Sequence, residues 1–282
     1  MLILKQIKDL ENHIKKVKKQ GIKVGFVPTM GALHKGHIAL INASRKHCKL
    51  TVCSIFVNPT QFNDKSDFDN YPVTIDNDIK MLSLAGCDVL FLPSVKEVYP
   101  NGFEQKRPFN FGFIANILEG AFRPGHFNGM AQVVERLLKI VKPDILFMGQ
   151  KDYQQQLIVG QLIKKMKIKT RLVMVPTIRE KSGLAMSSRN TRLDAASLNL
   201  AVQISKTLKS AKTQINNPKA DIRDVQEKGF KKLSGLRGIE PEYFEIRNAK
   251  TLDVPKRKTE KLIGLTAVKI GGVRLIDNME LN

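Results

Sequence analysis

Short apolar runs that alternate with helical patterns constrain the fold of the first two-thirds of this chain more than any other feature. The runs are rich in Val, Ile, Leu and Phe, as strands buried on both faces are. They lie at Ile22–Thr29, Leu50–Val57, Asp88–Leu92, Asp144–Gly149 and Arg171–Pro176. Apolar residues at helical spacing lie between them, at Gly36–His47, Met130–Val141 and Tyr153–Met166. This alternation predicts an α/β fold built on a doubly wound parallel sheet.

The pattern changes after Pro176, and this change predicts an N-terminal domain of residues 1–176 and a smaller α+β domain of residues 177–282. The second domain is expected to begin with two helices, at Asp194–Ala211 and Asp221–Leu233. Three short strands are expected to follow, at Tyr243–Ile246, Leu262–Ile270 and Val273–Ile276. Gly271 and Gly272 suit a two-residue hairpin turn between the last two strands. We therefore expect a three-stranded antiparallel sheet in this domain.

The chain is strongly basic, with a formal net charge of +21. A nucleic acid or an anionic membrane is one partner that such a charge suggests. The excess is mostly lysine scattered over presumed helix surfaces and loops, Trp is absent, and aromatic residues make up only 6% of the chain. Sites that recognise bases usually add aromatic side chains or arginine-rich stripes, so the pattern favours a solvated surface over a nucleic-acid interface. Such a surface also attracts anionic substrates.

Cysteine usage and the N-terminal sequence bear on where the protein works. Cys48, Cys53 and Cys87 are an odd number of cysteines without a C-x-x-C pair, which argues against a disulfide framework and a structural zinc site. Cys53 lies in an apolar run and is expected to be a buried free thiol. The N-terminus is charged too early for a signal peptide, and no apolar run is long enough to span a bilayer. We expect a cytoplasmic protein.

The strongest local motif is P-T-M-G-A-L-H-K-G-H at Pro28–His37, between the first predicted strand and the helix after it. That position puts a glycine-containing turn and a helix N-terminus at the carboxyl edge of a parallel sheet, where phosphate groups bind. His34 and His37 are three residues apart, so both imidazoles can face one ligand and stabilise developing charge on it. A zinc pair is the alternative, but no cysteine or acidic cluster supplies an obvious further ligand. The pattern is neither a Walker loop nor G-x-G-x-x-G.

Three further motifs follow predicted strands. Phe56–Phe62 carries uncharged amides that suit a polyol or carboxylate substrate, and Gly149–Gln155 carries Lys151 to neutralise phosphate and Asp152 to bond a ribose hydroxyl. Met186–Asn190 places two hydroxyls before a guanidinium, a set that can hold a triphosphate. Each motif alone is usually a surface turn or a capped helix start. Their succession at the carboxyl ends of strands favours a single site.

The H-x-G-H pattern resembles the signature of the nucleotidyl-transfer superfamily, and the whole set resembles one family within it. P-T-M-G-A-L-H-x-G-H, F-V-N-P-T-Q-F, R-P-G-H-F-x-G, G-x-K-D-Y-Q-Q and M-S-S-R-N, in this order, are similar to the motifs of the pantothenate synthetases, or pantoate–β-alanine ligases. The resemblance implies a Rossmann-like N-terminal domain that binds ATP and pantoate, and a C-terminal lid. It implies the last step of pantothenate (vitamin B5) biosynthesis, in which ATP activates D-pantoate as pantoyl adenylate before β-alanine attacks. It also implies a homodimer, and Mg²⁺ bound through the ATP phosphates with no metal ligand from the protein.

The resemblance also implies roles for individual residues. His37, His34, Lys151 and Arg189 are expected to be catalytic. Gln61 is expected to hold pantoate and to border the β-alanine site, and Gln155 to hold pantoate. The expected ATP-binding residues are Met30, Gly31, Ala32, Leu33, His34, Lys35, Gly36, His37, Gly149, Gln150, Lys151, Asp152, Ile178, Met186, Ser187, Ser188 and Arg189.

Some features of the motifs remain open at this point. Gln150 stands where the family commonly has Glu. Arg123 and His126, in R-P-G-H-F, either order a loop over the site or turn the chain before the helix that follows. Two other functions compete with the ligase. Another H-x-G-H nucleotidyltransferase would differ in nucleotide preference, and a basic RNA-binding module would bind RNA in a salt-dependent way without turning over ATP.

Overall fold

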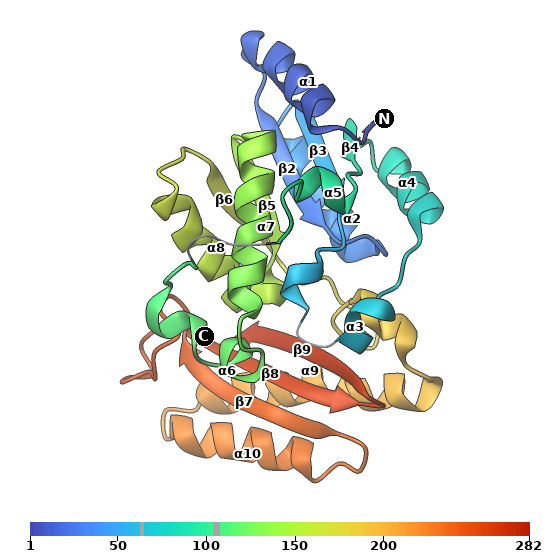
Figure 1. Ribbon diagram of the computed structural model, residues 1–282. Helices are drawn as coiled ribbons and strands as arrows, with labels where there is room; N and C mark the ends of the chain where they lie inside the picture. Colours follow the sequence, from blue (N-terminus) through green and yellow to red (C-terminus); the bar gives the residue numbers. More distant parts are fainter. Residues whose placement is uncertain (63–64, 104–107) are drawn as a thin grey trace. The chain divides into compact units, whose positions relative to one another are not determined.

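A computed structural model of the protein describes residues 1–62, 65–103 and 108–282. The chain divides into two compact units, each treated by itself below. The first unit comprises Met1–Gln150 and Gln154–Pro176, and the second comprises Lys151–Tyr153 and Thr177–Asn282. Figure 1 shows the helices and strands of both units.

A six-stranded parallel sheet forms the centre of the first unit, as the alternation of apolar runs predicts. Its strands, in spatial order, are β1 (Leu2–Leu4), β4 (Val89–Phe91), β3 (Leu50–Ile55), β2 (Val24–Thr29), β5 (Ile145–Gly149) and β6 (Arg171–Val175). The chain runs outward from β2 through β3 and β4, then returns to the other side of β2 to form β5 and β6. The strand order therefore reverses between β2 and β5. In open α/β sheets, ligands bind beyond the carboxyl ends of the strands at such a switch point.

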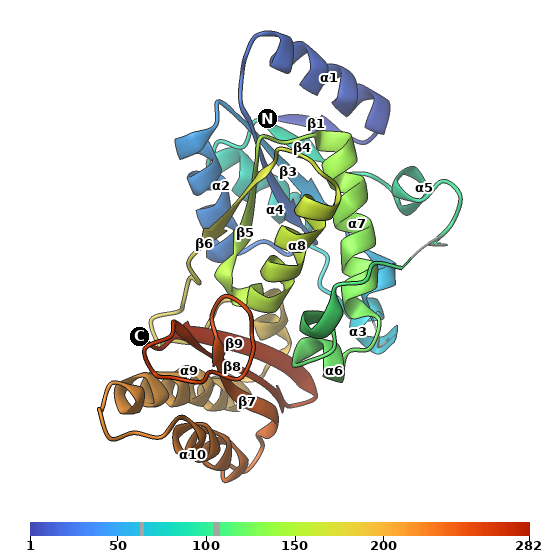
Figure 2. The same cartoon turned by 90° about the vertical axis from the view of Figure 1, so that its left-hand side faces the viewer.

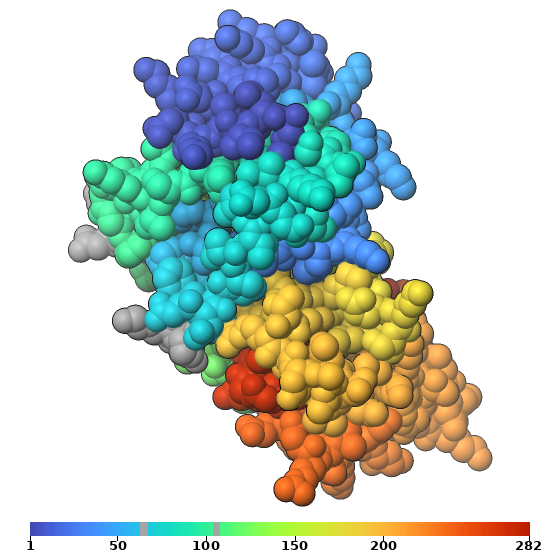
Figure 3. All heavy atoms as spheres, turned by 90° about the vertical axis from the view of Figure 1, so that its right-hand side faces the viewer, coloured from blue at the N-terminus to red at the C-terminus, as the bar shows by residue number. Residues whose placement is uncertain are grey.

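Helices cover both faces of this sheet. α2 (Lys35–His47) lies on one side and α7 (His126–Val141) on the other (Figure 2). α7 buries most of its length, and α2 packs on β2, β3 and β5. The remaining helices of the unit are α1 (Ile7–Lys19), α3 (Lys65–Asp69), α4 (Ile75–Leu84), α5 (Val95–Val98), α6 (Glu119–Phe122) and α8 (Tyr153–Lys165), whose first residue groups with the second unit. α3 and α4 lie at the surface of the face shown in Figure 3.

The second unit is the predicted combination of two helices and three strands. α9 (Ala195–Ile215) and α10 (Ile222–Ser234) pack on an antiparallel sheet of β7 (Glu240–Asn248), β8 (Leu262–Ile270) and β9 (Val273–Glu280), with β8 in the middle. Gly271 and Gly272 have φ of 55° and 73°, as a two-residue turn with left-handed residues requires, and so the expected hairpin is confirmed. β7 and β9 are longer than predicted because polar residues at their ends continue the ladder.

Several elements differ from the predictions. β1, α1 and α4 were not predicted. The two exposed leading residues of the edge strand β1, Leu2 and Ile3, carry no alternation signal. α7 begins at His126 rather than Met130, because Gly125 precedes it with a left-handed φ of 82°. Among the described residues, no helix combines the length and the apolar character that crossing a bilayer requires.

The three cysteines are free and buried, as expected for Cys53. Burial raises the pKa of the Cys87 thiol to about 12 and that of Cys53 well above its usual range, and it also raises the pKa of Cys48. Because a raised pKa keeps a thiol protonated, we predict that iodoacetamide at about pH 8 alkylates none of the three in the folded protein and all three in concentrated guanidinium chloride. Mass spectrometry of the intact chain counts the adducts. Rapid labelling of Cys87 in the folded state would contradict this assignment of the core.

Candidate active site

The loop between β2 and α2 has a conformation that a buried carboxylate holds in place. Gly31 and Ala32 both have left-handed backbones, with φ of 85° and 47°. Ala32 N–H donates to Oδ2 of Asp78 at 2.9 Å, and Leu33 N–H donates to Oδ1 at 2.8 Å. Asp78 is fully buried and also accepts from the Thr74 hydroxyl at 3.0 Å. The left-handed backbone of Ala32 carries a conformational cost, and the carboxylate offsets it.

Asp78 is a residue that the motif analysis missed. It lies on α4, 45 residues from Leu33, and nothing in the sequence around it connects it with the first motif. The only available signal was an acidic residue in the first turn of a helix, which is an ordinary place for one.

The side chains of the two histidines in the first motif together form the N-terminal cap of α2. His34 is the N-cap residue, and its Nδ1 accepts from Gly36 N–H at 3.1 Å. His37 Nδ1 accepts from His34 N–H at 3.2 Å, and the ring centroids are 4.1 Å apart. Because each Nδ1 is an acceptor, the proton of each neutral ring is on Nε2. The cap thus fixes the tautomer that presents an N–H donor at the Nε2 end of both rings.

Gln61 contacts the same loop from the end of β3. It closes a 3-10 turn at Pro59–Gln61, and its Nε2 lies 2.9 Å from the sulfur of Met30. Asn58, which is 1% exposed, donates from Nδ2 to Oε1 of Gln61 at 3.2 Å and accepts from the Tyr99 hydroxyl at 2.8 Å. The structure therefore brings together Met30 and Gln61, which the sequence assigned to ATP and to pantoate.

The segment after β5 belongs to both units. Gly149 ends β5 beside β2, and Gln150 is the last residue before the boundary. The carbonyl of Lys151 accepts from Asn278 Nδ2 at 2.8 Å, and the Tyr153 hydroxyl donates to the Ala249 carbonyl at 2.7 Å. Lys151, Asp152 and Tyr153 consequently form part of the second unit, a grouping that the sequence did not indicate.

Adjacent glutamines at the start of α8 differ in their surroundings. The amide of Gln154 is 2% exposed and bonds Glu119 N–H and the carbonyls of Ile114 and Ile117 at 2.7 to 3.0 Å. Gln154 is thus a structural residue that anchors the 114–119 segment. Gln155, the glutamine that the sequence assigned to pantoate, is partly exposed.

The Ile178 and Met186 regions of the second unit face each other in a small hairpin. Met186 N–H donates to the Ile178 carbonyl at 3.0 Å, next to an antiparallel bridge between Arg179 and Ala185. Ser187 caps the 3-10 helix Ser188–Arg192 by accepting from Arg189 N–H at 3.3 Å. One small cavity of this unit is lined by Lys151, Ser187, Asn190 and Asp277, among others. The cavity is only about 10 Å³, room for no more than one water, so it shows that Lys151 and Ser187 lie near each other but is not itself a phosphate site.

A buried ion pair supports that hairpin. Arg179 donates from both terminal nitrogens to Asp277, at 2.7 and 2.9 Å, and the Asp277 side chain is 2% exposed. Arg179 also donates to the carbonyls of Gly183 and Asn278. The same guanidinium thus ties the hairpin to β9, next to the asparagine that bonds Lys151.

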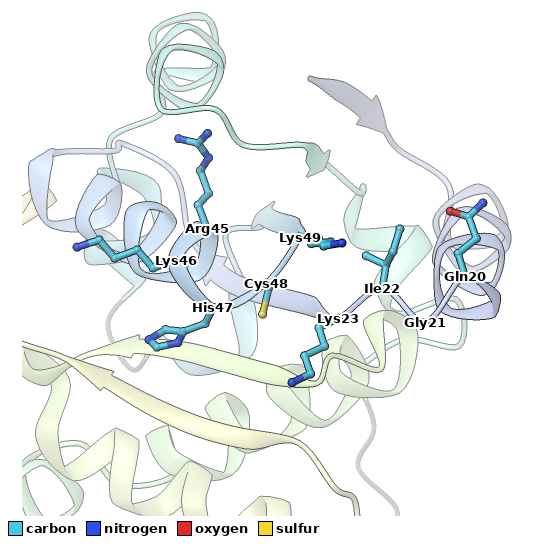
Figure 4. Close-up of a pocket in the computed structure, with 9 residues that line it drawn as sticks. All are labelled: Gln20, Gly21, Ile22, Lys23, Arg45, Lys46, His47, Cys48 and Lys49. Carbon is cyan, nitrogen blue, oxygen red and sulfur yellow. The ribbon is translucent and has the colours of Figure 1, made fainter.

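A larger hollow in the first unit, of about 400 Å³, is not part of this site. It is lined by Gln20–Lys23 and Arg45–Lys49, which precede β2 and β3 and so lie at the opposite, amino-terminal edge of the sheet. The side chains of Lys23, Lys46 and Lys49 point in different directions (Figure 4), so they do not converge on one ligand. In the described part of the chain, no group of three His, Cys, Asp or Glu side chains is placed to hold a metal ion.

Comparison with known proteins decides the family. The sequence model described as pantoate-beta-alanine ligase matches residues 2–280. This chain belongs to the pantoate–β-alanine ligase family. A pantothenate synthetase of Cytophaga hutchinsonii is 43% identical to it over 99% of both chains, and one of Aliivibrio fischeri is 40% identical over 99% of this chain and 96% of the relative. The family resemblance of the five motifs is therefore confirmed.

Solved structures of pantoate–β-alanine ligases have the same fold. The pantothenate synthetase from Thermus thermophilus superimposes with a TM-score of 0.93 at 34% identity, over all of this chain and 99% of that one. The pantoate-beta-alanine ligase from Francisella tularensis, complexed with beta-gamma ATP and beta-alanine, gives a TM-score of 0.82 at 38% identity, over all of this chain and 98% of that one. These matches confirm the predicted fold class, a doubly wound parallel sheet with a smaller α+β domain.

Proposed function

We propose that this chain joins D-pantoate to β-alanine in an ATP-dependent reaction that also yields AMP and pyrophosphate. The observation that carries the proposal is membership of the pantoate–β-alanine ligase family over essentially the whole chain. The positions of the motifs support it, because Pro28–His37 and the end of β5 flank the point where the strand order reverses.

The reaction has two steps. A carboxylate oxygen of pantoate attacks the α-phosphorus of ATP, the bond to the bridging oxygen breaks, and pyrophosphate leaves. The amine of β-alanine then attacks the carbonyl carbon of the pantoyl adenylate, the carbon–oxygen bond to AMP breaks, and the amine loses a proton. Both steps depend on positioning and on stabilising charge, and neither requires a nucleophile from the protein.

His34 and His37 are proposed to act on the phosphates of ATP. Negative charge grows on phosphate oxygens as the α-phosphorus is attacked, and donors that are already oriented stabilise it at low cost in reorganisation. The capping bonds at Nδ1 support this role because they leave Nε2–H as the donor of each neutral ring. The helix N-terminus adds a further positive partial charge at the same place. Met30–Leu33, Lys35 and Gly36 are proposed to complete this part of the ATP site.

Lys151 and residues of the 177–282 domain are proposed to supply the remaining phosphate ligands, and that domain is proposed to act as a lid on residues 1–176. Lys151, Ser187 and Arg189 carry positive charge or donors suited to a triphosphate. Ile178, bonded through its backbone to Met186, is proposed to meet the adenine. Gly149, Gln150, Asp152 and Ser188 are proposed as further ATP contacts. Gln61 is proposed to hold pantoate and border β-alanine, and Gln155 to hold pantoate.

Three further features are proposed from the family. ATP is expected to bind as its Mg²⁺ complex, with the ion on the phosphates and without a protein ligand. The chain is expected to form a homodimer and to act in the cytoplasm. Size-exclusion chromatography with light scattering measures the oligomeric state, and omission of Mg²⁺ from the assay tests the metal requirement.

Product analysis tests the proposed function. The purified chain is mixed with ATP, Mg²⁺, D-pantoate and β-alanine, and AMP and pantothenate are quantified while each component is omitted in turn. Equal amounts of AMP and pantothenate, formed only in the complete mixture, are expected. Replacing ATP by CTP is expected to abolish the reaction. AMP without pantothenate, or turnover with CTP, would contradict the proposal and point to another nucleotidyltransferase.

A further inference from the structure

Arg123 and His126 hold the backbone carbonyl of Gln61. His126 Nδ1 lies 2.8 Å from that oxygen, and Arg123 Nη2 donates to the same oxygen at 3.3 Å. Arg123 Nη1 lies 3.1 Å from Nε2 of His126. A carbonyl can only accept and a guanidinium can only donate, so one neutral tautomer of His126, with the proton on Nδ1, satisfies all three contacts.

The surroundings keep this arrangement in place. His126 is 5% exposed, and the Arg123 side chain is 20% exposed and lies 3.6 Å from the Glu119 carboxylate. The first turn of α7 also approaches the Pro59–Gln61 turn so closely that a Cβ atom at Gly129 would lie 2.0 Å from the Thr60 carbonyl oxygen. The R-P-G-H-F-x-G motif thus starts α7 and docks that start against Gln61.

Gln61 is therefore fixed from two directions. Asn58 bonds its side-chain amide, while Arg123 and His126 bond its main chain. The β2–α2 loop has its own support, because the Ala32 and Leu33 N–H groups donate to Asp78, although the Gln61 amide also lies 2.9 Å from the Met30 sulfur in that loop. Loss of the bonds from Arg123 and His126 to the Gln61 carbonyl is therefore expected to raise the KM for pantoate more than the KM for ATP.

We propose that Arg123 and His126 are positioning residues for the hydroxy-acid substrate: by fixing the Gln61 main chain, they orient its amide toward pantoate. The inference rests on the proposed function of Gln61. It assigns the R-P-G-H-F motif to substrate binding through a second residue, rather than to a turn alone.

Two substitutions of similar size separate positioning from packing. In His126→Asn, the amide nitrogen can occupy the place of Nδ1 and still donate to the Gln61 carbonyl. In His126→Gln, the amide lies at the position of Nε2 and that donor is lost, while both variants lose the ring that packs near Phe127. We expect His126→Gln to raise the KM for pantoate by about tenfold and His126→Asn by about threefold or less, with the KM for ATP within about twofold in both.

Steady-state kinetics with each substrate varied, together with thermal unfolding of each variant, makes the test. Equal effects of the two substitutions, or parallel rises in the KM for ATP and for pantoate, would overturn the proposal. Should His126→Gln fail to fold, Arg123→Lys serves in its place. Lysine keeps the positive charge but cannot contact both His126 and the Gln61 carbonyl as the two terminal nitrogens of Arg123 do. An unchanged KM for pantoate in that variant would also overturn the proposal. The unsubstituted chain is assayed in parallel: if the proposed function itself is wrong, none of the proteins makes pantothenate, whereas if only this inference is wrong, the unsubstituted chain still makes it.

Discussion

Replacing His37 by alanine is expected to slow pantoyl-adenylate formation by about 10²–10³-fold, the usual loss when one oriented donor to a developing oxyanion is removed. The fold is expected to survive, because His37 is partly exposed and the lost capping bond is worth about 1 kcal/mol. Pyrophosphate release in the absence of β-alanine, followed over a single turnover, isolates this step from the later attack of the amine.

A matched pair of substitutions distinguishes the donor at Nε2 from the cap at Nδ1. In His37→Asn, Oδ1 can accept from His34 N–H and keep the cap, but no donor reaches the position of Nε2. In His37→Gln, the amide nitrogen can replace Nε2 as a donor, and glutamine at this third helical position can also accept from His34 N–H through its amide oxygen. We expect both variants to be stable, the asparagine variant to be nearly as slow as alanine, and the glutamine variant to be faster. The reverse order of rates would show that His37 acts through the cap.

Replacing Asp78 by alanine is expected to lower the free energy of unfolding by about 3 kcal/mol, because two N–H groups and a hydroxyl lose their buried acceptor. The KM for ATP is expected to rise as well, since Ala32 keeps its left-handed backbone only while the carboxylate holds it. Urea unfolding followed by circular dichroism measures the stability, and initial rates at varied ATP measure the KM.

Asp76 offers the control for that experiment. It lies on the same helix two residues away and is exposed, so Asp76→Ala is expected to change the free energy of unfolding by no more than about 0.5 kcal/mol and to leave the KM for ATP unchanged. If both alanine variants behave alike, the carboxylate of Asp78 does not hold the loop.

The sequence could predict those features that depend on residues close together in the chain. Strands β2, β3 and β5 were found because burial on both faces makes them apolar runs, a property each segment shows by itself. The motifs after these strands were located for the same reason. The hairpin at Gly271 and Gly272 was found because a turn with two left-handed residues needs glycine at both positions.

Contacts between distant segments were not predictable in this way. Asp78 is linked to the β2–α2 loop only after α4 has folded onto the unit, and Asn278 is linked to Lys151 only after β9 has formed. Gln154 and Gln155 are adjacent and chemically identical, and only the packed structure shows which of them bonds the 114–119 segment. Likewise, the sequence placed His34 and His37 on one ligand, but their tautomer depends on the capping bonds seen in the structure.

In the proposed mechanism, the carboxylate of pantoate attacks the α-phosphorus of ATP in this chain's active site. The most direct test uses D-pantoate with oxygen-18 in both carboxylate positions, and mass spectrometry of the products after complete conversion. Transfer of one labelled oxygen to AMP, with the other retained in pantothenate and none in pyrophosphate, is the result we predict. Unlabelled AMP, or label in pyrophosphate or inorganic phosphate, would contradict the claim, because no acyl adenylate would then have formed.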